Sequence, residues 1–202
     1  FSNYPKTHTH FLTSVEKNRS NQKSSSIPLF FFPEKVYAKE SKKAGRDHMD
    51  KIFQGCDWGF FPDPYAFIRL YYNHNTEKIY LIDEIYENKW SNRKSADEIL
   101  KRKYDDYAIT CDSAEPKSIN DYRDFGLPAR GAIKGPGSVE YSMKWLQTRT
   151  IVIDPKRTPN AYKEFSEYEY ERDKDGNVIS GYPDENNHLI DACRYATESL
   201  WR

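Results

Sequence analysis

From Ile52 onward, short apolar segments separated by polar turns predict strands first and an alternation of helices and strands later. Three strands are predicted over residues 52–58, 66–72 and 78–86. The polar residues 74–77 supply a turn between the second and the third of these strands. We therefore expect an antiparallel meander of three strands, in a fold that starts near Phe30.

The second half of the chain shows the alternation. Helices are predicted over residues 95–104, 116–125, 138–146 and 160–168, and strands over 107–112, 129–133 and 150–153. Pro116 suits a first helical turn, Gly126 a helix end, and Ser138 a helix cap. A final helix carries His188, Asp191, Arg194 and Tyr195. A meander followed by helices and strands predicts a mixed α/β sheet, and an RNase H-like architecture is the simplest match.

Residues 168–179 are predicted to form an additional β-hairpin near the site expected around Asp57, Asp112 and Asp191. Tyr and Glu alternate at its start, and Asp175-Gly176 is a strong hairpin turn signal. Because the segment is acidic, we expect it to gate the site or guide a strand there rather than to bind phosphate.

The size of the chain suits one well-packed domain. It has 202 residues with 37% hydrophobic content, and we place the domain at residues 28–202. Residues 1–27 are polar and without periodicity, which indicates a flexible arm, a linker or sequence added for expression. Because the chain starts at Phe1, we expect it to be a fragment of a longer protein.

Cysteine usage and hydropathy exclude several classes of protein. Cys56, Cys111 and Cys193 are widely spaced and odd in number, which does not fit a disulfide framework or a zinc site, so we expect buried thiols of an intracellular protein. The chain shows neither an apolar run of membrane-spanning length nor a signal-peptide pattern. No membrane partner is expected.

Charge is balanced overall and uneven along the chain. The formal net charge is zero, which argues against a protein that coats nucleic acid indiscriminately. Residues 52–85 include 2 basic and 5 acidic residues, and residues 151–202 include 7 basic and 11 acidic residues. Negative charge therefore gathers around two of three aspartates that stand out in the sequence.

Those aspartates, Asp57, Asp112 and Asp191, are each embedded in an apolar segment. Buried carboxylates are costly unless they are paired or bind a metal. Carboxylate oxygens suit Mg²⁺ and Mn²⁺, and a pair of such ions stabilises both the attacking and the leaving oxygen of a phosphate. His188 lies three residues before Asp191, on the same helical face, and an imidazole shifts the preference toward Mn²⁺. The pattern predicts phosphodiester chemistry.

Four segments in order carry a family resemblance: GCDWG (55–59), TCDSAEPKS (110–118), KGPGSV (134–139) and DENNHLIDACRY (184–195). With them the chain resembles the C-terminal nuclease domain of the large terminase subunit of tailed bacteriophages, of the SPP1/PBSX-like type. The resemblance covers about residues 30–200. It implies an RNase H-like fold and a metal-dependent endonuclease that cuts double-stranded DNA concatemers during genome packaging, with low sequence specificity.

The same resemblance implies a site, cofactors and partners. Asp57, Asp112, Asp191 and His188 would be catalytic and would hold two divalent cations, Mn²⁺ or Mg²⁺, with Asp57 bridging them. Expected partners are double-stranded DNA and, through the full-length enzyme, the small terminase subunit and the portal protein, in the cytoplasm of the infected bacterial host. The chain has no phosphate loop of the type GxxxxGK[ST], so DNA translocation is not ascribed to it.

Other charged residues have a plain alternative explanation. Lys117, Arg130, Lys134 and Lys144 are candidates for DNA binding, although a solvated surface explains them equally well. Asp83, Glu84, Asp184 and Glu185 are either second-layer acids or ordinary surface and helix-start residues. Two other classes also stay open: another RNase H-like nuclease of the resolvase or transposase type, and a non-catalytic docking module for DNA or protein.

Overall fold

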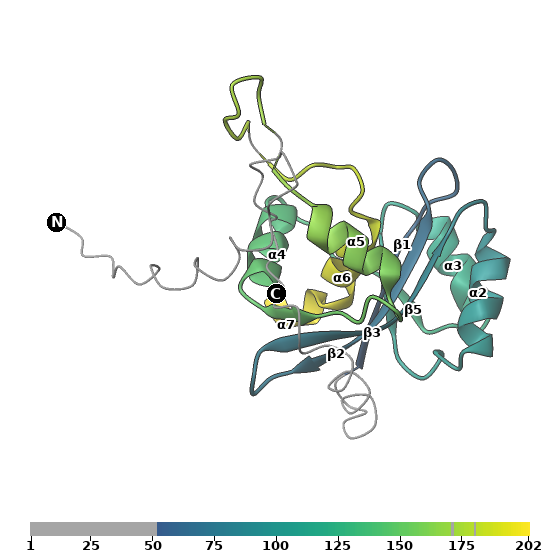
Figure 1. Cartoon of the computed structure of the whole chain (residues 1–202). Helices are drawn as coiled ribbons and strands as arrows, with labels where there is room; N and C mark the ends of the chain where they lie inside the picture. The colour runs from purple at the N-terminus through teal and green to yellow at the C-terminus, as the bar shows by residue number, and fades with distance from the viewer. Residues whose placement is uncertain (1–51, 171, 180) are drawn as a thin grey trace.

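The computed structural model describes residues 52–170, 172–179 and 181–202 (Figure 1). The predicted arm at residues 1–27, the domain start at residue 28 and the fold start near Phe30 lie outside the described residues.

A mixed sheet forms the centre of the described part, with its six strands in the order β5-β4-β1-β2-β3-β6. The strands are β1 (Ile52–Asp57), β2 (Tyr65–Asn73), β3 (Lys78–Glu87), β4 (Ile109–Cys111), β5 (Ala129–Gly131) and β6 (Thr150–Val152). β1, β2 and β3 form the predicted antiparallel meander. β4 and β5 extend the sheet in parallel from β1, and β6 pairs in parallel with β3. The predicted mixed α/β sheet is confirmed.

Helices cover both faces of this sheet (Figure 1). They are α2 (Asn92–Lys101), α3 (Pro116–Asp124), α4 (Ser138–Gln147), α5 (Pro159–Glu167), α6 (His188–Ala196) and α7 (Glu198–Trp201). On one face, α2 and α3 pack over a cluster that includes Phe67, Ile99 and Tyr122. On the other, α4, α5 and α6 pack over a larger cluster that includes Ile68 and Leu189. Along β2, Phe67 faces the first cluster and Ile68 the second. A third, smaller cluster contains the meander residues Ile52, Tyr71, Tyr80 and Ile82 together with Val152.

Local chemistry changes one predicted helix start and one predicted helix cap. α2 begins before residue 95 because the Ser91 side chain accepts a hydrogen bond from the Lys94 amide and caps the helix there. Ser138 does not cap α4, and that prediction was wrong. Gly137 takes the cap position with φ of 74°, a left-handed conformation that glycine adopts without strain, and Ser138 becomes the first helical residue.

The predicted hairpin at residues 168–179 has its turn but little strand pairing. Asp173 and Asn177 bond across the turn through both backbone and side-chain atoms. Between the flanking residues, the described part of the segment shows one isolated bridge, Arg172 with Val178. The loop projects beyond α4 and α5 at the top of Figure 1.

All three cysteines are buried free thiols, as predicted. Cys56 and Cys111 lie in the core beneath α2 and α3, on the opposite sheet face from α6. Burial raises the pKa of the Cys56 and Cys193 thiols well above its usual value. None of the helices in the described ranges has the length and apolar character needed to cross a membrane.

Candidate active site

The predicted acidic residues meet in one cavity of about 350 Å³ at an edge of the sheet. Asp57 is the last residue of β1, and Asp112 directly follows β4. Because β1 and β4 are parallel neighbours, their carboxyl ends lie at the same edge. α6 brings His188 and Asp191 to this edge. The cavity is lined by Asp57, Trp58, Asp63, Asp112, Lys134, Ser138, Val139, Asp184, Asn187, His188, Asp191, Arg194 and Tyr195.

Gly55 allows α6 to lie directly on β1. A Cβ atom at this position would lie 1.9 Å from the carbonyl oxygen of Ala192 and 2.7 Å from the amide nitrogen of Ala196. Any larger residue would therefore push the helix away from the strand. Asp57 lies two residues farther along β1, on the same face as Gly55, so it faces α6. This close approach brings residues of β1 and α6 into one site.

Asp57 and His188 are joined across 131 positions of sequence. Nδ1 of His188 lies 3.1 Å from Oδ2 of Asp57, and both side chains are mostly buried. Burial raises the pKa of Asp57 to about 6, and the charges of Asp191 and Asp112 add to this, while His188 opposes it. Burial lowers the pKa of His188, but the hydrogen bond to Asp57 and the charges of Asp57, Glu164 and Asp63 together outweigh burial and leave the pKa raised.

Asp112 is bonded to a loop amide and to a lysine. Its Oδ1 accepts a hydrogen bond from the Ala114 amide at 2.8 Å, and its carbonyl oxygen accepts one from the Trp58 indole at 3.0 Å. Nζ of Lys134, in the loop after β5, lies 2.5 Å from Oδ1. Asp112 is not the cap of α3, because Glu115 occupies that position. Asp112 therefore does not serve as a helix cap.

Asp191 is paired with a buried arginine on its own helix. Nη1 of Arg194 lies 2.5 Å from Oδ1 of Asp191, and Nε of Arg194 donates to the Ser142 hydroxyl at 2.7 Å. Burial raises the pKa of Asp191, although Arg194 opposes the shift. The arginine is fixed on both sides and holds the carboxylate in place.

Each aspartate is thus turned toward its own cationic partner. As the side chains stand, no group of three or more His, Cys, Asp or Glu residues in the described ranges is arranged to hold one metal ion. The donor set still fits hard divalent cations, because three carboxylates and an imidazole share one cavity. Burial raises the pKa values of Asp57 and Asp191, so a cation bound beside them would favour their charged forms.

Of the four candidate DNA-binding residues, Lys134 alone lines the cavity. Arg130 pairs with the buried Glu198 at 2.8 Å. Lys144 pairs with Glu140 on the exposed side of α4, and Lys117 is exposed at the start of α3. Arg130 and Lys144 have partners outside the cavity, whereas Lys134 pairs with Asp112 inside it.

Of the four other acidic candidates, one lines the cavity and three lie elsewhere. Asp184 lines the cavity, whereas Glu185 lines a neighbouring pocket. Glu84 is buried against α5, and Asp83 pairs with Arg102.

Sequence reasoning missed Asp63, whose Oδ1 lies 3.8 Å from Nε2 of His188. Its side chain is 71% exposed and lies in an irregular loop, so no periodic pattern marked it. It also missed the role of Gly55. That role can be recognised only when the packing of α6 on β1 is known.

Comparisons with known proteins agree with this fold and identify the family. The family model described as Terminase RNAseH like domain matches residues 57–199. The chain is 45% identical over 163 residues to the large terminase subunit of Bacillus phage SPP1, which spans 75% of this chain and 39% of that protein. It is 32% identical over 145 residues to the PBSX phage terminase large subunit of Bacillus subtilis (strain 168), which spans 71% of this chain and 33% of that protein.

A solved structure gives the same answer for the fold. The crystal structure of the large terminase nuclease domain from bacteriophage SPP1 with bound Mn matches with a TM-score of 0.77 at 40% identity. The match covers 86% of this chain and 99% of that one. The predicted RNase H-like fold and the predicted resemblance to terminase nuclease domains are both confirmed. This chain belongs to the terminase RNase H-like domain family.

Proposed function

We propose that this chain is a metal-dependent endodeoxyribonuclease that cuts double-stranded phage DNA concatemers during genome packaging, with low sequence specificity. The observation that carries the proposal is the meeting of Asp57, Asp112, Asp191 and His188 in one cavity. The likeness to the SPP1 nuclease domain, which was solved with bound Mn, supports it.

The same four residues would hold two divalent cations, Mn²⁺ or Mg²⁺. When bound, such ions supply Lewis acidity that activates a water and stabilises the leaving 3′ oxygen of the phosphodiester. Asp57 is the best candidate for a shared ligand. Burial raises its pKa most, and the charges of both Asp191 and Asp112 add to the shift, so Asp57 interacts with both other aspartates.

The basic side chains of the site have different proposed roles. Arg194 is buried and bonded to Ser142, so it stays beside Asp191 and orients that carboxylate. The Lys134 side chain is 43% exposed on a flexible stem, so it can turn from Asp112 to a DNA phosphate. His188 has two chemically sound roles, as a ligand when neutral or as a proton carrier when protonated.

Whole-protein partners follow from the family. The chain spans 39% and 33% of the two relatives' lengths. Contacts with a small terminase subunit and a portal protein, in the cytoplasm of an infected bacterium, are proposed for the full-length enzyme.

Plasmid cleavage tests the proposal directly. The purified chain is incubated with supercoiled and linear plasmid in Mn²⁺, Mg²⁺ or EDTA, beside Asp57→Ala and the control Asp105→Ala, which changes an exposed aspartate. We expect cutting that requires metal and Asp57 and is unaffected in the control. Cutting by Asp57→Ala at the wild-type rate contradicts the assignment. A marked preference for four-way junctions over linear duplex points instead to a resolvase.

A further inference from the structure

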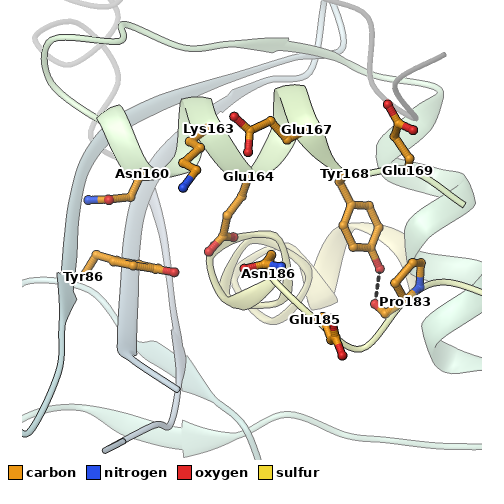
Figure 2. Close-up of a pocket in the computed structure, with 10 residues that line it drawn as sticks. All are labelled: Tyr86, Asn160, Lys163, Glu164, Glu167, Tyr168, Glu169, Pro183, Glu185 and Asn186. Carbon is orange, nitrogen blue, oxygen red and sulfur yellow. Dashed lines mark hydrogen bonds between the residues drawn. The ribbon is translucent and has the colours of Figure 1, made fainter. Parts of the chain in front are cut away.

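A buried glutamate from a neighbouring helix caps the helix that carries His188 and Asp191 (Figure 2). Glu164 lies on α5 and is 5% exposed. Its Oε2 accepts hydrogen bonds from the amides of Leu189 at 2.7 Å and Ile190 at 3.2 Å. These amides belong to the first turn of α6, where no intrahelical acceptor exists. The cap residue of α6, Asn187, makes no side-chain cap bond, so Glu164 takes that role.

The same arrangement occurs one step earlier, between the sheet and α5. Glu84 on β3 is 8% exposed. Its Oε1 accepts from the amide and the side-chain nitrogen of Asn160, at 2.9 and 2.8 Å, and its Oε2 accepts from the Ala161 amide at 2.9 Å. Thr158, the cap residue of α5, makes no side-chain cap bond. A carboxylate on the central sheet therefore caps α5 as Glu164 on α5 caps α6.

The two caps form a series that ends in the candidate active site. β3 holds the first turn of α5 through Glu84, and α5 holds the first turn of α6 through Glu164. Each carboxylate binds two consecutive backbone amides, which limits both sliding and rotation of the helix that it caps. His188 begins α6, and Asp191 follows within its first turn. The axial position of α6 thus decides where these two side chains lie relative to Asp57.

We propose that Glu84 and Glu164 are positioning residues that act in series to hold His188 and Asp191 in register with Asp57. Neither residue lines the cavity, so neither touches substrate. The proposal rests on the proposed nuclease function only for its catalytic consequence. Its structural consequence, an ordered first turn of α6, is measured without DNA.

The oxygens of Glu164 make a sharp substitution series possible. Oε2 accepts both amides, whereas the buried Oε1 accepts no backbone amide, and the Glu164 carboxyl group faces the Tyr86 hydroxyl across the pocket (Figure 2). Glu164→Gln therefore keeps the acceptor that caps α6. Glu164→Asp keeps the carboxyl group but is one methylene too short, and Glu164→Ala removes the acceptor. Glu167→Ala is the matched control, because Glu167 is exposed one turn farther along the same helix.

The first readout is amide hydrogen exchange in the full metal-free chain. In Glu164→Ala and Glu164→Asp we expect the Leu189 and Ile190 amides to exchange about tenfold faster, with a smaller uniform change elsewhere. Glu164→Gln and Glu167→Ala should exchange as wild type does. If every amide accelerates by the same factor, Glu164 merely stabilises the whole fold, and the proposal is overturned.

The second readout is the Mn²⁺ concentration that gives half of the maximal thermal shift. Removing a residue that orients metal-binding side chains typically weakens metal affinity roughly tenfold or more. We expect that rise for Glu164→Ala and near-wild-type values for Glu164→Gln. Unchanged Mn²⁺ midpoints in Glu164→Ala contradict a positioning role.

Glu84 tests whether the caps act in series. Both of its oxygens accept amides, so Glu84→Gln should speed hydrogen exchange at the Asn160 and Ala161 amides. Glu164→Gln, by contrast, should leave the exchange of its two amides unchanged. Glu84→Ala should also raise the Mn²⁺ midpoint. In the double variant of Glu84→Ala and Glu164→Ala, the midpoint should match that of Glu164→Ala alone, because the second cap is already absent. Additive midpoints overturn the series.

These outcomes separate the positioning role from the nuclease function. If the wild type cuts no DNA but Glu164→Ala loosens α6 and weakens Mn²⁺ binding, the positioning role stands and the nuclease assignment falls. If the wild type cuts DNA and Glu164→Ala binds Mn²⁺ and cuts DNA equally well, the nuclease assignment stands and the positioning role falls.

Discussion

Lys134 places its ammonium group 2.5 Å from Oδ1 of Asp112, inside the cavity where the three aspartates meet. The two side chains come from different segments, the loop after β5 and the residue after β4. Lys134 is far more exposed than Arg194, the partner of Asp191, with 43% against 6% of the side chain accessible. A partly exposed ion pair contributes little net stability, so this lysine is free to exchange partners.

Lys134→Ala tests that exchange. Removing the lysine takes away a cation that competes for Asp112, so the Mn²⁺ concentration for half-maximal thermal shift should fall severalfold. The KM for plasmid cleavage should rise severalfold, because a phosphate contact is lost. Lys144→Ala, which removes an exposed partner of Glu140, is the control and should change neither quantity. An unchanged KM in Lys134→Ala would remove Lys134 from the DNA-binding surface.

Gly55→Ala should separate the active-site helix from its strand. The added methyl group would overlap the backbone of Ala192 and Ala196, which cannot give way as a flexible side chain can. We expect a loss of about 3 kcal/mol or more in the free energy of unfolding, measured in urea, and loss of cleavage. In the control Gly135→Ala nothing lies within 4 Å of the new methyl group, and the change should stay within about 0.5 kcal/mol. Wild-type stability in Gly55→Ala would contradict the direct contact.

Arg130→Ala should affect stability. Arg130 pairs with Glu198, whose side chain is 3% exposed and also accepts a hydrogen bond from the Ile133 amide. Without the arginine, a buried carboxylate loses its principal cation, and the free energy of unfolding should fall by about 1–2 kcal/mol. Thermal unfolding measures this, with the exposed Lys117→Ala as a control that should melt as wild type does. A wild-type melting temperature for Arg130→Ala would show that the pair adds nothing.

The sequence predicted the meander, the order of helices and strands, and the acids that meet in the cavity. Asp57, Asp112 and Asp191 were visible because charged residues in apolar segments are unusual. The family resemblance then assigned all three to one site. What it predicted less well were positions set by a single backbone angle. Serine is favoured at helix caps, yet Gly137 with its positive φ took that position from Ser138.

The caps of α5 and α6 were beyond local reasoning for another reason. Glu84 bonds to Ala161 across 77 positions, and Glu164 to Leu189 across 25. Neither has the sequence spacing of a capping box, which lies within one turn. The alternation of side chains along β3 predicted that Asp83 and Glu84 point to opposite faces of the sheet. It did not predict which of the two is buried. Only the tertiary structure shows which helix start lies opposite each carboxylate.

The pKa values of the site predict how stability depends on pH. Burial raises the pKa of Asp57 from 3.8 to about 6, and that of Glu164 from 4.5 to about 7. A group whose pKa is higher in the folded chain contributes stability that is present below its unfolded pKa and lost as the pH rises through its folded pKa. The raised pKa of His188 acts in the same direction. The metal-free chain should therefore lose stability as the pH rises from about 4 to about 7.

Divalent metal should reverse that trend, because only deprotonated carboxylates and a neutral imidazole bind it. Thermal unfolding in EDTA should show a falling melting temperature between about pH 4 and pH 7, with each of the two acids contributing at most about 3 kcal/mol. In excess Mn²⁺, the metal-induced gain should grow over the same range. Asp57→Asn removes one titrating group, so its EDTA profile should be flatter and its Mn²⁺ gain small at every pH. A metal-induced gain that is equal at both ends of the range would show that these acids are not the metal ligands.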